Sequence, residues 1–260
     1  MDSAQIINLY LQGLGAPAIA DKLGITNYFV YKALRQNNIC IRDASHKSQK
    51  YSIDEMYFAN IDTPEKAYWL GFLYADGYVS KNAFGCALKQ QDKKHLEKFK
   101  AAIGSTHPVK ILTATGFSVG KPYCRLLIAN QTISNQLRAL GINENKSQSA
   151  NYPAINSTLD RHFIRGYLDG DGSWAKSKKS ASGFTMKICG TKSILESIAI
   201  RLRLPVEKVK PHKNIFILEK SGKDVLRLMN YLYTNADTYL ERKYKRWFVA
   251  QSLLAERPIE

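Results

Sequence analysis

Two acidic residues, Asp76 and Asp171, are the side chains of this sequence best placed to do chemistry. Each ends one copy of a nine-residue pattern, WLGFLYADG at 69–77 and IRGYLDGDG at 164–172. Both copies are largely apolar, carry small residues at the third and seventh places, and close on an acid followed by glycine. Because a packed helix that ends in a carboxylate bears a desolvation cost, an acid at this place in both copies indicates a task.

The small residues explain how the two acids could meet. Gly71 and Ala75 are four positions apart, as are Gly166 and Gly170, and positions four apart share one face of an α-helix. Small side chains on that face let two helix backbones approach closely. We therefore expect the two segments to cross as helices and to bring both acids to one point.

Two carboxylates that meet in this way predict a divalent cation. At a few ångströms they raise each other's pKa, and a cation between them removes the conflict. The five histidines and four cysteines are scattered, without a pair at metal-ligand spacing. Oxygen ligands alone favour a hard ion, Mg²⁺ first, which could activate water and neutralise charge on a phosphate undergoing in-line displacement.

The charge of the chain indicates its partner. Its 260 residues include 38 Lys and Arg against 22 Asp and Glu, a formal net charge of +16, which favours a polyanion, and nucleic acid before a membrane surface. No segment approaches the roughly 20 apolar residues that span a bilayer, and the first residues lack a secretion-signal pattern. We expect no membrane partner and a cytoplasmic location in a prokaryotic or phage-infected cell, with an organelle as the other option.

The first 45 residues have the pattern of a helix-turn-helix DNA-binding domain. Apolar spacing predicts a helix over 4–11, Pro17 suits the first turn of a second helix, and a third helix is expected over 27–36 after a glycine-containing turn. In this plan the last helix enters the major groove. Its polar face, expected to contact DNA, consists of Asn27, Tyr28, Tyr31, Lys32 and Arg35.

From residue 67 onward the chain repeats itself. Alternating and helical patterns predict the order αββαββα twice, in a first domain at 67–148 and a second at 161–260. The polar segments 46–66 and 149–160 are interpreted as linkers. The expected fold class is α+β, with two pseudo-symmetric domains containing antiparallel sheets and a small all-α domain before them.

Over roughly residues 67–250 the doubled motif resembles the LAGLIDADG homing endonucleases in their single-chain, two-motif form. The N-terminal helical unit is similar to that of versions encoded by phages or mobile introns. The resemblance implies that the motif helices form the interface between the halves and that the sheets form a saddle over the DNA major groove. It further implies that Asp76 and Asp171 bind Mg²⁺, with the backbone carbonyls of Ala75 and Gly170 as added ligands.

The same resemblance assigns three more residues to the catalytic site. Lys146 and Lys243, which follow the last helix of each half, match lysines near the active-site water and the scissile phosphate. Gln90 matches a polar residue that holds solvent near the metal. Its counterpart in the second half is Cys189, a mismatch that predicts unequal halves. Tyr74 stands where the motif often has an acid, whereas Asp169 keeps that acid.

A set of mostly basic residues occupies or flanks the expected strands and should face the major groove. Some contact phosphates, which adds affinity without sequence information, and others reach base edges; the sequence leaves open which do so. The set consists of Lys81, Lys89, Gln90, Arg125, Lys176, Lys178, Lys179, Lys187, Lys210 and Lys213.

The sequence therefore predicts a site-specific, Mg²⁺-dependent endonuclease that makes a double-strand break in a long asymmetric DNA target and acts as a monomer. Metal-activated water would attack the scissile phosphates, Mn²⁺ would substitute, and Ca²⁺ would bind without supporting cleavage. The alternative is a non-cleaving nucleic-acid binder on the same scaffold, either a transcription regulator or an RNA-splicing maturase. The presence of both acids and both lysines argues against a purely regulatory role but leaves a bifunctional maturase open.

Overall fold

The computed structural model describes residues 3–12, 14–39, 41, 51–115, 119–176 and 183–255. The chain divides into two compact units, Met1–Ser52 and Ile53–Glu260, and each has a hydrophobic core of its own. None of the described helices is both long enough and apolar enough to cross a bilayer.

The first unit consists of three short helices, α1 (Ser3–Leu11), α2 (Ala16–Leu23) and α3 (Asn27–Gln36). They lie where the apolar spacing predicts them, with Pro17 in the first turn of α2. Gly24 ends α2 with a left-handed φ of +62°, a conformation that glycine adopts without steric cost. Ile6, Ile19 and Val30, one from each helix, meet in the core.

The second unit contains two four-stranded antiparallel sheets, which confirms the predicted α+β class. The first is built from β1 (Gly77–Val79), β2 (Ala83–Lys89), β3 (Lys110–Thr113) and β4 (Pro122–Ala129), in the order β1-β2-β4-β3. The second is built from β5 (Gly172–Lys176), β6 (Phe184–Gly190), β7 (Val209–His212) and β8 (Ile215–Gly222), in the order β5-β6-β8-β7. The identical strand order shows that the two halves repeat one topology.

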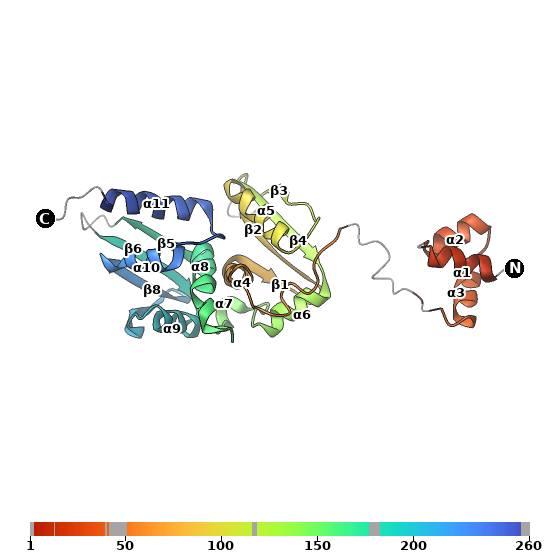
Figure 1. The fold of residues 1–260 in the computed structure, drawn as a ribbon, viewed down its shortest axis with the longest axis horizontal. Coiled ribbons are helices and arrows are strands. Elements are labelled where there is room, and N and C mark those ends of the chain that lie inside the picture. Colours follow the sequence, from red (N-terminus) through yellow and green to blue (C-terminus); the bar gives the residue numbers. More distant parts are fainter. Residues whose placement is uncertain are drawn as a thin grey trace. The chain divides into compact units, whose positions relative to one another are not determined.

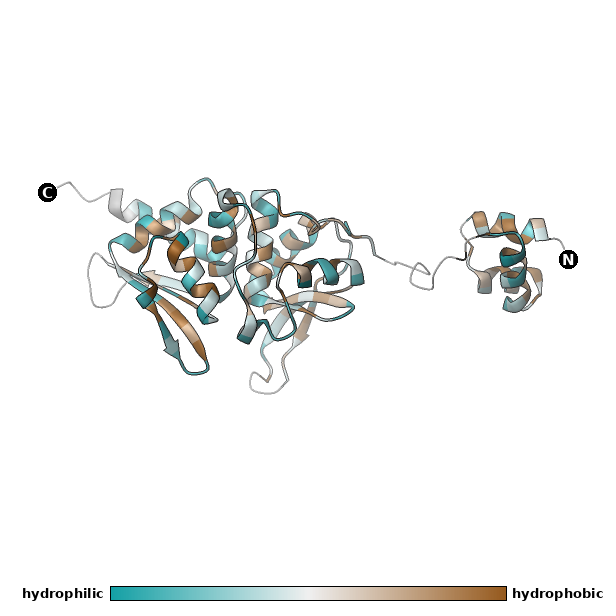
Figure 2. Ribbon diagram, turned by 90° about the horizontal axis from the view of Figure 1, so that it is seen from below, coloured by the Kyte–Doolittle hydropathy of each residue, from teal (hydrophilic) through white to brown (hydrophobic). Residues whose placement is uncertain are grey.

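Helices cover one face of each sheet. The first half contributes α4 (Pro64–Asp76), α5 (Lys93–Ala102), α6 (Gln131–Ala139) and the short α7 (Lys146–Ser149). The second contributes α8 (Asp160–Asp171), α9 (Lys192–Arg201), α10 (Asp224–Tyr233) and α11 (Glu241–Ala255). Figure 2 shows these helices gathered on one side of the unit and the strands reaching the other. Along β4 and β6, buried residues that face the helices alternate with more exposed residues on the open face, as expected for a half-covered sheet.

The two motif helices, α4 and α8, lie side by side at the centre of this unit (Figure 1). Helix α4 begins after Thr63, whose hydroxyl accepts a hydrogen bond from the Lys66 N–H at 3.2 Å, and its residues 67–75 are all buried. A helix that is apolar on every side belongs in the middle of a protein. The motif helices are therefore the central layer between the two sheets.

Three expected boundaries differ from the structure. Residues 53–66, expected in the first linker, pack on the core: Phe58 is 1% exposed and contacts Phe99, and α4 already starts at Pro64. Helix α8 starts at Asp160, inside the expected second linker. The 15-residue α11 was not predicted; its basic and polar residues obscure an apolar stripe that buries Trp247 and Ala250.

Candidate active site at the crossing of the motif helices

Two glycines allow the backbones of α4 and α8 to touch. A Cβ atom on Gly71 would lie 2.0 Å from the carbonyl oxygen of Phe163, and one on Gly166 would lie 2.0 Å from that of Tyr68. Contacts this short exclude any side chain at either position. The close crossing predicted from the spacing of small residues is thus present, and it is equally tight on both sides.

The crossing places Asp76 against the end of the partner helix. A Cβ atom on Gly170 would lie 2.3 Å from the Cβ of Ala75 and 3.3 Å from Oδ2 of Asp76. The Asp76 carboxylate therefore lies beside the backbone that leads directly into Asp171. Asp76 is half-buried, whereas Asp171 stays in contact with solvent.

The electrostatics of the site reflect this proximity. Burial and then the charge of Asp171 raise the pKa of Asp76 to about 6, although Lys243 and Lys146 act in the opposite direction. Burial also raises the pKa of Asp171, again against both lysines. Both carboxylates are thus held in surroundings that disfavour their charge, so that added positive charge at this point would be favourable.

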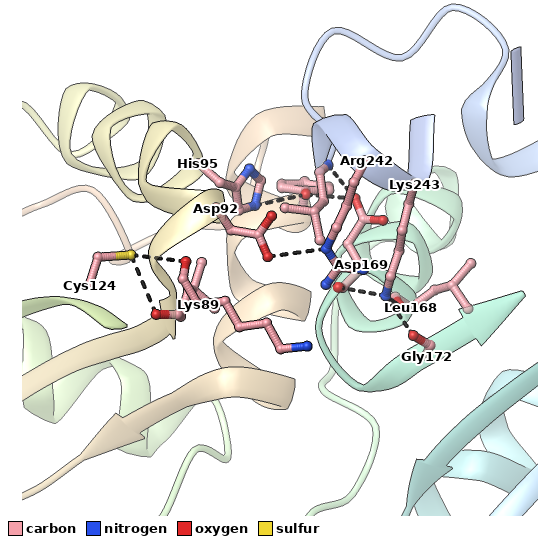
Figure 3. Close-up of polar contacts among 12 residues, drawn as sticks. Lys89, Asp92, His95, Cys124, Leu168, Asp169, Gly172, Arg242 and Lys243 are labelled. Atoms are coloured by element: carbon pink, nitrogen blue, oxygen red, sulfur yellow. Dashed lines mark hydrogen bonds and ion pairs between the residues drawn. The ribbon is translucent and has the colours of Figure 1, made fainter. Parts of the chain in front are cut away.

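Both predicted lysines reach the crossing, where they bind the carbonyl ends of the motif helices. Lys146 Nζ donates to the carbonyls of Tyr74, at 2.7 Å, and Ala75. Lys243 Nζ donates to the carbonyls of Leu168, Asp169 and Gly172 at 2.5, 2.7 and 2.6 Å (Figure 3). Except for that of Gly172, which begins β5, these carbonyls lie in the last turn of a motif helix, at the negative end of its dipole, so an ammonium group stabilises them.

The two ammonium groups differ in their degree of burial. Lys243 is 2% exposed, and burial lowers its pKa to about 8. Burial also lowers the pKa of Lys146, while both acids of the crossing raise it. The cation that binds the end of α8 is thus more deeply buried than the cation that binds the end of α4.

Asp169 has a structural role that the sequence did not reveal. Its carboxylate is fully buried and accepts hydrogen bonds from the hydroxyls of Tyr68 and Tyr233, at 2.8 and 2.6 Å, and from the Leu240 N–H at 2.7 Å. Because Leu240 precedes α11, Asp169 fixes the start of the helix that carries Lys243. In the first half the equivalent Tyr74 instead donates its hydroxyl to the carbonyl of Leu140.

Two further polar contacts lie beside these residues, one within the first half and one between the halves. The Tyr68 hydroxyl, already bound to the second half, also lies 3.1 Å from Nε2 of His95, and burial lowers the pKa of that imidazole to about 3, so the ring is neutral. Arg242 Nε forms an ion pair with Oδ2 of Asp92 at 3.1 Å (Figure 3). Neither contact was anticipated from the sequence, because its partners lie far apart along the chain.

Gln90, the remaining predicted catalytic residue, is exposed in the turn Gln90–Asp92 beyond the end of β2. The strand register corrects its pairing with Cys189. Gly77 pairs with Cys86 in the first sheet and Gly172 with Ile188 in the second. Cys86 and Ile188 are therefore equivalent, and the next residues, Ala87 and Cys189, are equivalent as well. The predicted mismatch between Gln90 and Cys189 thus compares non-equivalent positions.

The predicted DNA-contacting residues are distributed over both units. On α3 the predicted residues Asn27, Tyr28, Lys32 and Arg35 are exposed, with Tyr28 at 66%, whereas Tyr31 is partly buried and packs against the core of the first unit. In the second unit, most of the others are exposed on strands or turns and Arg125 is partly exposed on β4; Lys178 and Lys179 lie outside the described residues. The exposed set consists of Lys81, Lys89, Lys176, Lys187, Lys210 and Lys213.

The donor set at the crossing fits a hard divalent cation. Within the described parts of the chain, no group of three or more His, Cys, Asp and Glu residues could hold a metal ion, so protein carboxylates would supply only part of a shell. Mg²⁺ binds in this manner, through one or two carboxylates with waters and substrate phosphate completing six ligands. Of the two predicted carbonyl ligands, that of Ala75 already accepts from Lys146.

Known structures share this fold. The DNA-bound homing endonuclease I-WcaI matches with a TM-score of 0.52 at 12% identity, over 74% of this chain and 90% of that one. The LAGLIDADG meganuclease I-AabMI, bound to uncleaved DNA, matches with a TM-score of 0.49 at 15% identity over the same shares. Meganuclease I-SmaMI, bound to uncleavable DNA, matches with a TM-score of 0.49 at 13% identity, over 75% of this chain and 92% of that one. No family model and no curated protein sequence matches the chain.

Proposed function

We propose that this chain is a site-specific, Mg²⁺-dependent endonuclease that makes a double-strand break in a long asymmetric DNA target and acts as a monomer. The observation that carries this proposal is the meeting of Asp76 and Asp171 at the glycine-mediated crossing, with Lys146 and Lys243 beside them. One acid and one lysine come from each half, which suits a reaction carried out once on each DNA strand.

Three observations support DNA as the substrate. The chain has a formal net charge of +16. Within the described part of the second unit, helices cover only one face of each sheet, and the similar structure of the homing endonuclease I-WcaI is a DNA complex. Two open antiparallel sheets side by side suit the major groove on either side of a central cut. We further propose that the first unit is a helix-turn-helix domain that extends the footprint through the exposed face of α3.

Asp76 and Asp171 would hold Mg²⁺ between the two helix ends. When bound there, Mg²⁺ supplies positive charge for a phosphate and lowers the pKa of a water molecule. With a pKa of about 6 in the metal-free protein, Asp76 is ionised at neutral pH and ready to bind a cation. Lys146 and Lys243 bind the helix ends that carry the acids, and so fix both carboxylates and place positive charge beside them.

A purely regulatory binder would leave this arrangement without a purpose. Two carboxylates of raised pKa at a helix crossing destabilise the fold at neutral pH, and an asparagine at either place would relieve that cost. We therefore favour cleavage over binding alone.

The test is selection from a randomised duplex library, with the protein bound in Ca²⁺ and then transferred to Mg²⁺. We expect enrichment of one asymmetric sequence and its cleavage in Mg²⁺. Asp76→Asn and Asp171→Asn should bind the same sequence and cut it at least about a hundredfold more slowly, because a catalytic metal is worth several kcal/mol. Asp62→Asn, which removes an exposed acid before α4, should cut normally. Undiminished cutting by either crossing variant would contradict the proposal.

A further inference from the structure

The open faces of the two sheets carry different chemistry at equivalent places. Gly77 and Gly172 directly follow the two acids, and the next row across each sheet is set by the strand register. In the first sheet this row, here called the first row, contains Tyr78, Gly85 and Leu127. In the second sheet the equivalent second row contains Ser173, Lys187 and Glu219.

The second row contains an ion pair on the open face. Lys187 Nζ lies 3.1 Å from Oε2 of Glu219, with side chains 46% and 43% exposed. The neighbours of these residues along the strands, Met186 and Leu218, are fully buried against the helices, so the pair points away from them. An exposed pair of this kind adds little to stability, which leaves its presence unexplained by folding alone.

An acid on a DNA-binding surface costs affinity unless it accepts a hydrogen bond from a base. In the major groove the donors are the amino groups of cytosine and adenine, and acidic side chains pair with cytosine N4. A lysine beside it donates to guanine O6 and N7. A carboxylate and an ammonium group in contact therefore match the two halves of one C·G base pair.

The first row offers no charge and no strong acceptor in the same place. The Tyr78 ring lies across Gly85, where a Cβ atom would meet Tyr78 Oη at 2.9 Å and Cε1 at 3.1 Å. Tyr78 is 37% exposed and Leu127 43% exposed. An apolar row of this kind contacts the methyl group of thymine, the one apolar feature of the major-groove edge.

We propose that these two rows read equivalent base pairs by opposite chemistry. Glu219 and Lys187 specify a C·G pair in one half-site, and Tyr78 with Leu127 specifies a thymine in the other. Because both rows directly follow the acids, these pairs lie in the parts of the half-sites closest to the cut. The inference rests on the proposed function, since it requires that the open sheet faces bind DNA.

The test compares bound sequences from a randomised duplex library in Ca²⁺ for the full chain and for Glu219→Gln. The wild-type protein should enrich a C·G pair at one position, and the variant should shift that position toward A·T, because glutamine pairs with adenine N6 and N7. We expect about a tenfold change in relative affinity there and none elsewhere. Glu196→Gln, which breaks an exposed Lys–Glu pair on α9, is the matched control and should leave the selected sequence unchanged.

Leu127→Gln tests the first row in the same selection, and should abolish the thymine preference in the other half-site. If Glu219→Gln and Glu196→Gln select the same sequence as the wild type, the pair reads no base and the inference is wrong while DNA binding stands. If the wild-type protein enriches nothing, DNA recognition itself fails, and the inference falls with the proposed function.

Discussion

The two halves of the core are nearly identical where they touch each other and different where they face outward. At the crossing, a Cβ atom on Gly71 or on Gly166 would lie at the same distance from a carbonyl oxygen of the other helix. In each half, a lysine binds carbonyls at the end of the motif helix. On the open faces, the first row is apolar, whereas the equivalent second row contains an ion pair. A duplicated fold thus keeps symmetry where one centre has to be built from two copies, and loses it where each copy faces its own stretch of a partner.

Polar contacts around the centre show an intermediate degree of divergence. The sixth place of the motif is Tyr74 in one half and Asp169 in the other, yet both fasten the segment that leads to the lysine. One residue does so by donating a hydrogen bond to a carbonyl and the other by accepting one from an N–H. The positions of the lysines are therefore shared by the halves even though the contacts that hold them are not.

The largest expected effect comes from filling the crossing. Gly71→Ala and Gly166→Ala should each lower the free energy of unfolding by about 3 kcal/mol, because overpacking forces the helix backbones apart. The two losses should agree within about 1 kcal/mol, since both clashes are with carbonyl oxygens at 2.0 Å. Urea unfolding measures them. Ala75→Gly, the small-residue control, should cost no more than about 1 kcal/mol, and a normally stable Gly71→Ala protein would contradict the described crossing.

Substitution of the two lysines should lower the free energy of unfolding by different amounts in the two halves. Lys243→Met removes the ammonium donor to three carbonyls at a buried site and should cost about 3 kcal/mol, whereas Lys146→Met removes the donor to two carbonyls at a partly exposed site and should cost about 1 to 2 kcal/mol. Urea unfolding in EDTA isolates this structural role from any metal. Equal losses would show that the deeper burial of Lys243 has no energetic consequence.

The smallest effect is a gain in stability. Because the pKa of Asp76 is raised to about 6 from an ordinary 3.8, the folded protein binds more protons than the unfolded chain between these values. The free energy of unfolding therefore falls as pH rises from about 4 to about 6 and stays lower above. In EDTA, Asp76→Asn should remove this fall and stabilise the protein at pH 7.5 by about 1 to 3 kcal/mol.

Thermal melts at pH 4 and pH 7.5 check this. The stabilisation of Asp76→Asn should be absent at pH 4, where the wild-type carboxyl is already protonated. Asp62→Asn, which changes an exposed acid, should give no gain at pH 7.5. A variant that is no more stable than the wild type at pH 7.5 would show that Asp76 is not under electrostatic strain.

Much of this architecture follows from local patterns. The repeated motif and the spacing of its small residues predicted the crossing of α4 and α8, and strand alternation predicted both sheets. The role of Asp169 could not be predicted, because its partners Tyr68 and Tyr233 come from distant helices and meet only after the fold forms. The same holds for the pairing of Lys187 with Glu219, which depends on the register of β6 against β8.

Helix α11 escaped prediction for another reason. It contains 15 residues, and only a narrow stripe of them is buried, so charged and exposed apolar side chains alternate without a clear period. Its N-terminal end is fixed from outside, by the contact between the Asp169 carboxylate and the Leu240 N–H. Tertiary contacts of this type override what the local sequence indicates.

The most direct test of the central claim is cation binding by the full chain without DNA. Mn²⁺ binding followed by electron paramagnetic resonance, with Mg²⁺ as competitor, should show a site that Asp76→Asn and Asp171→Asn each weaken at least about tenfold, while Asp62→Asn leaves it intact. Such a result would establish that one acid from each half contributes to a shared site. Equal binding by the wild-type protein and both crossing variants would contradict the account.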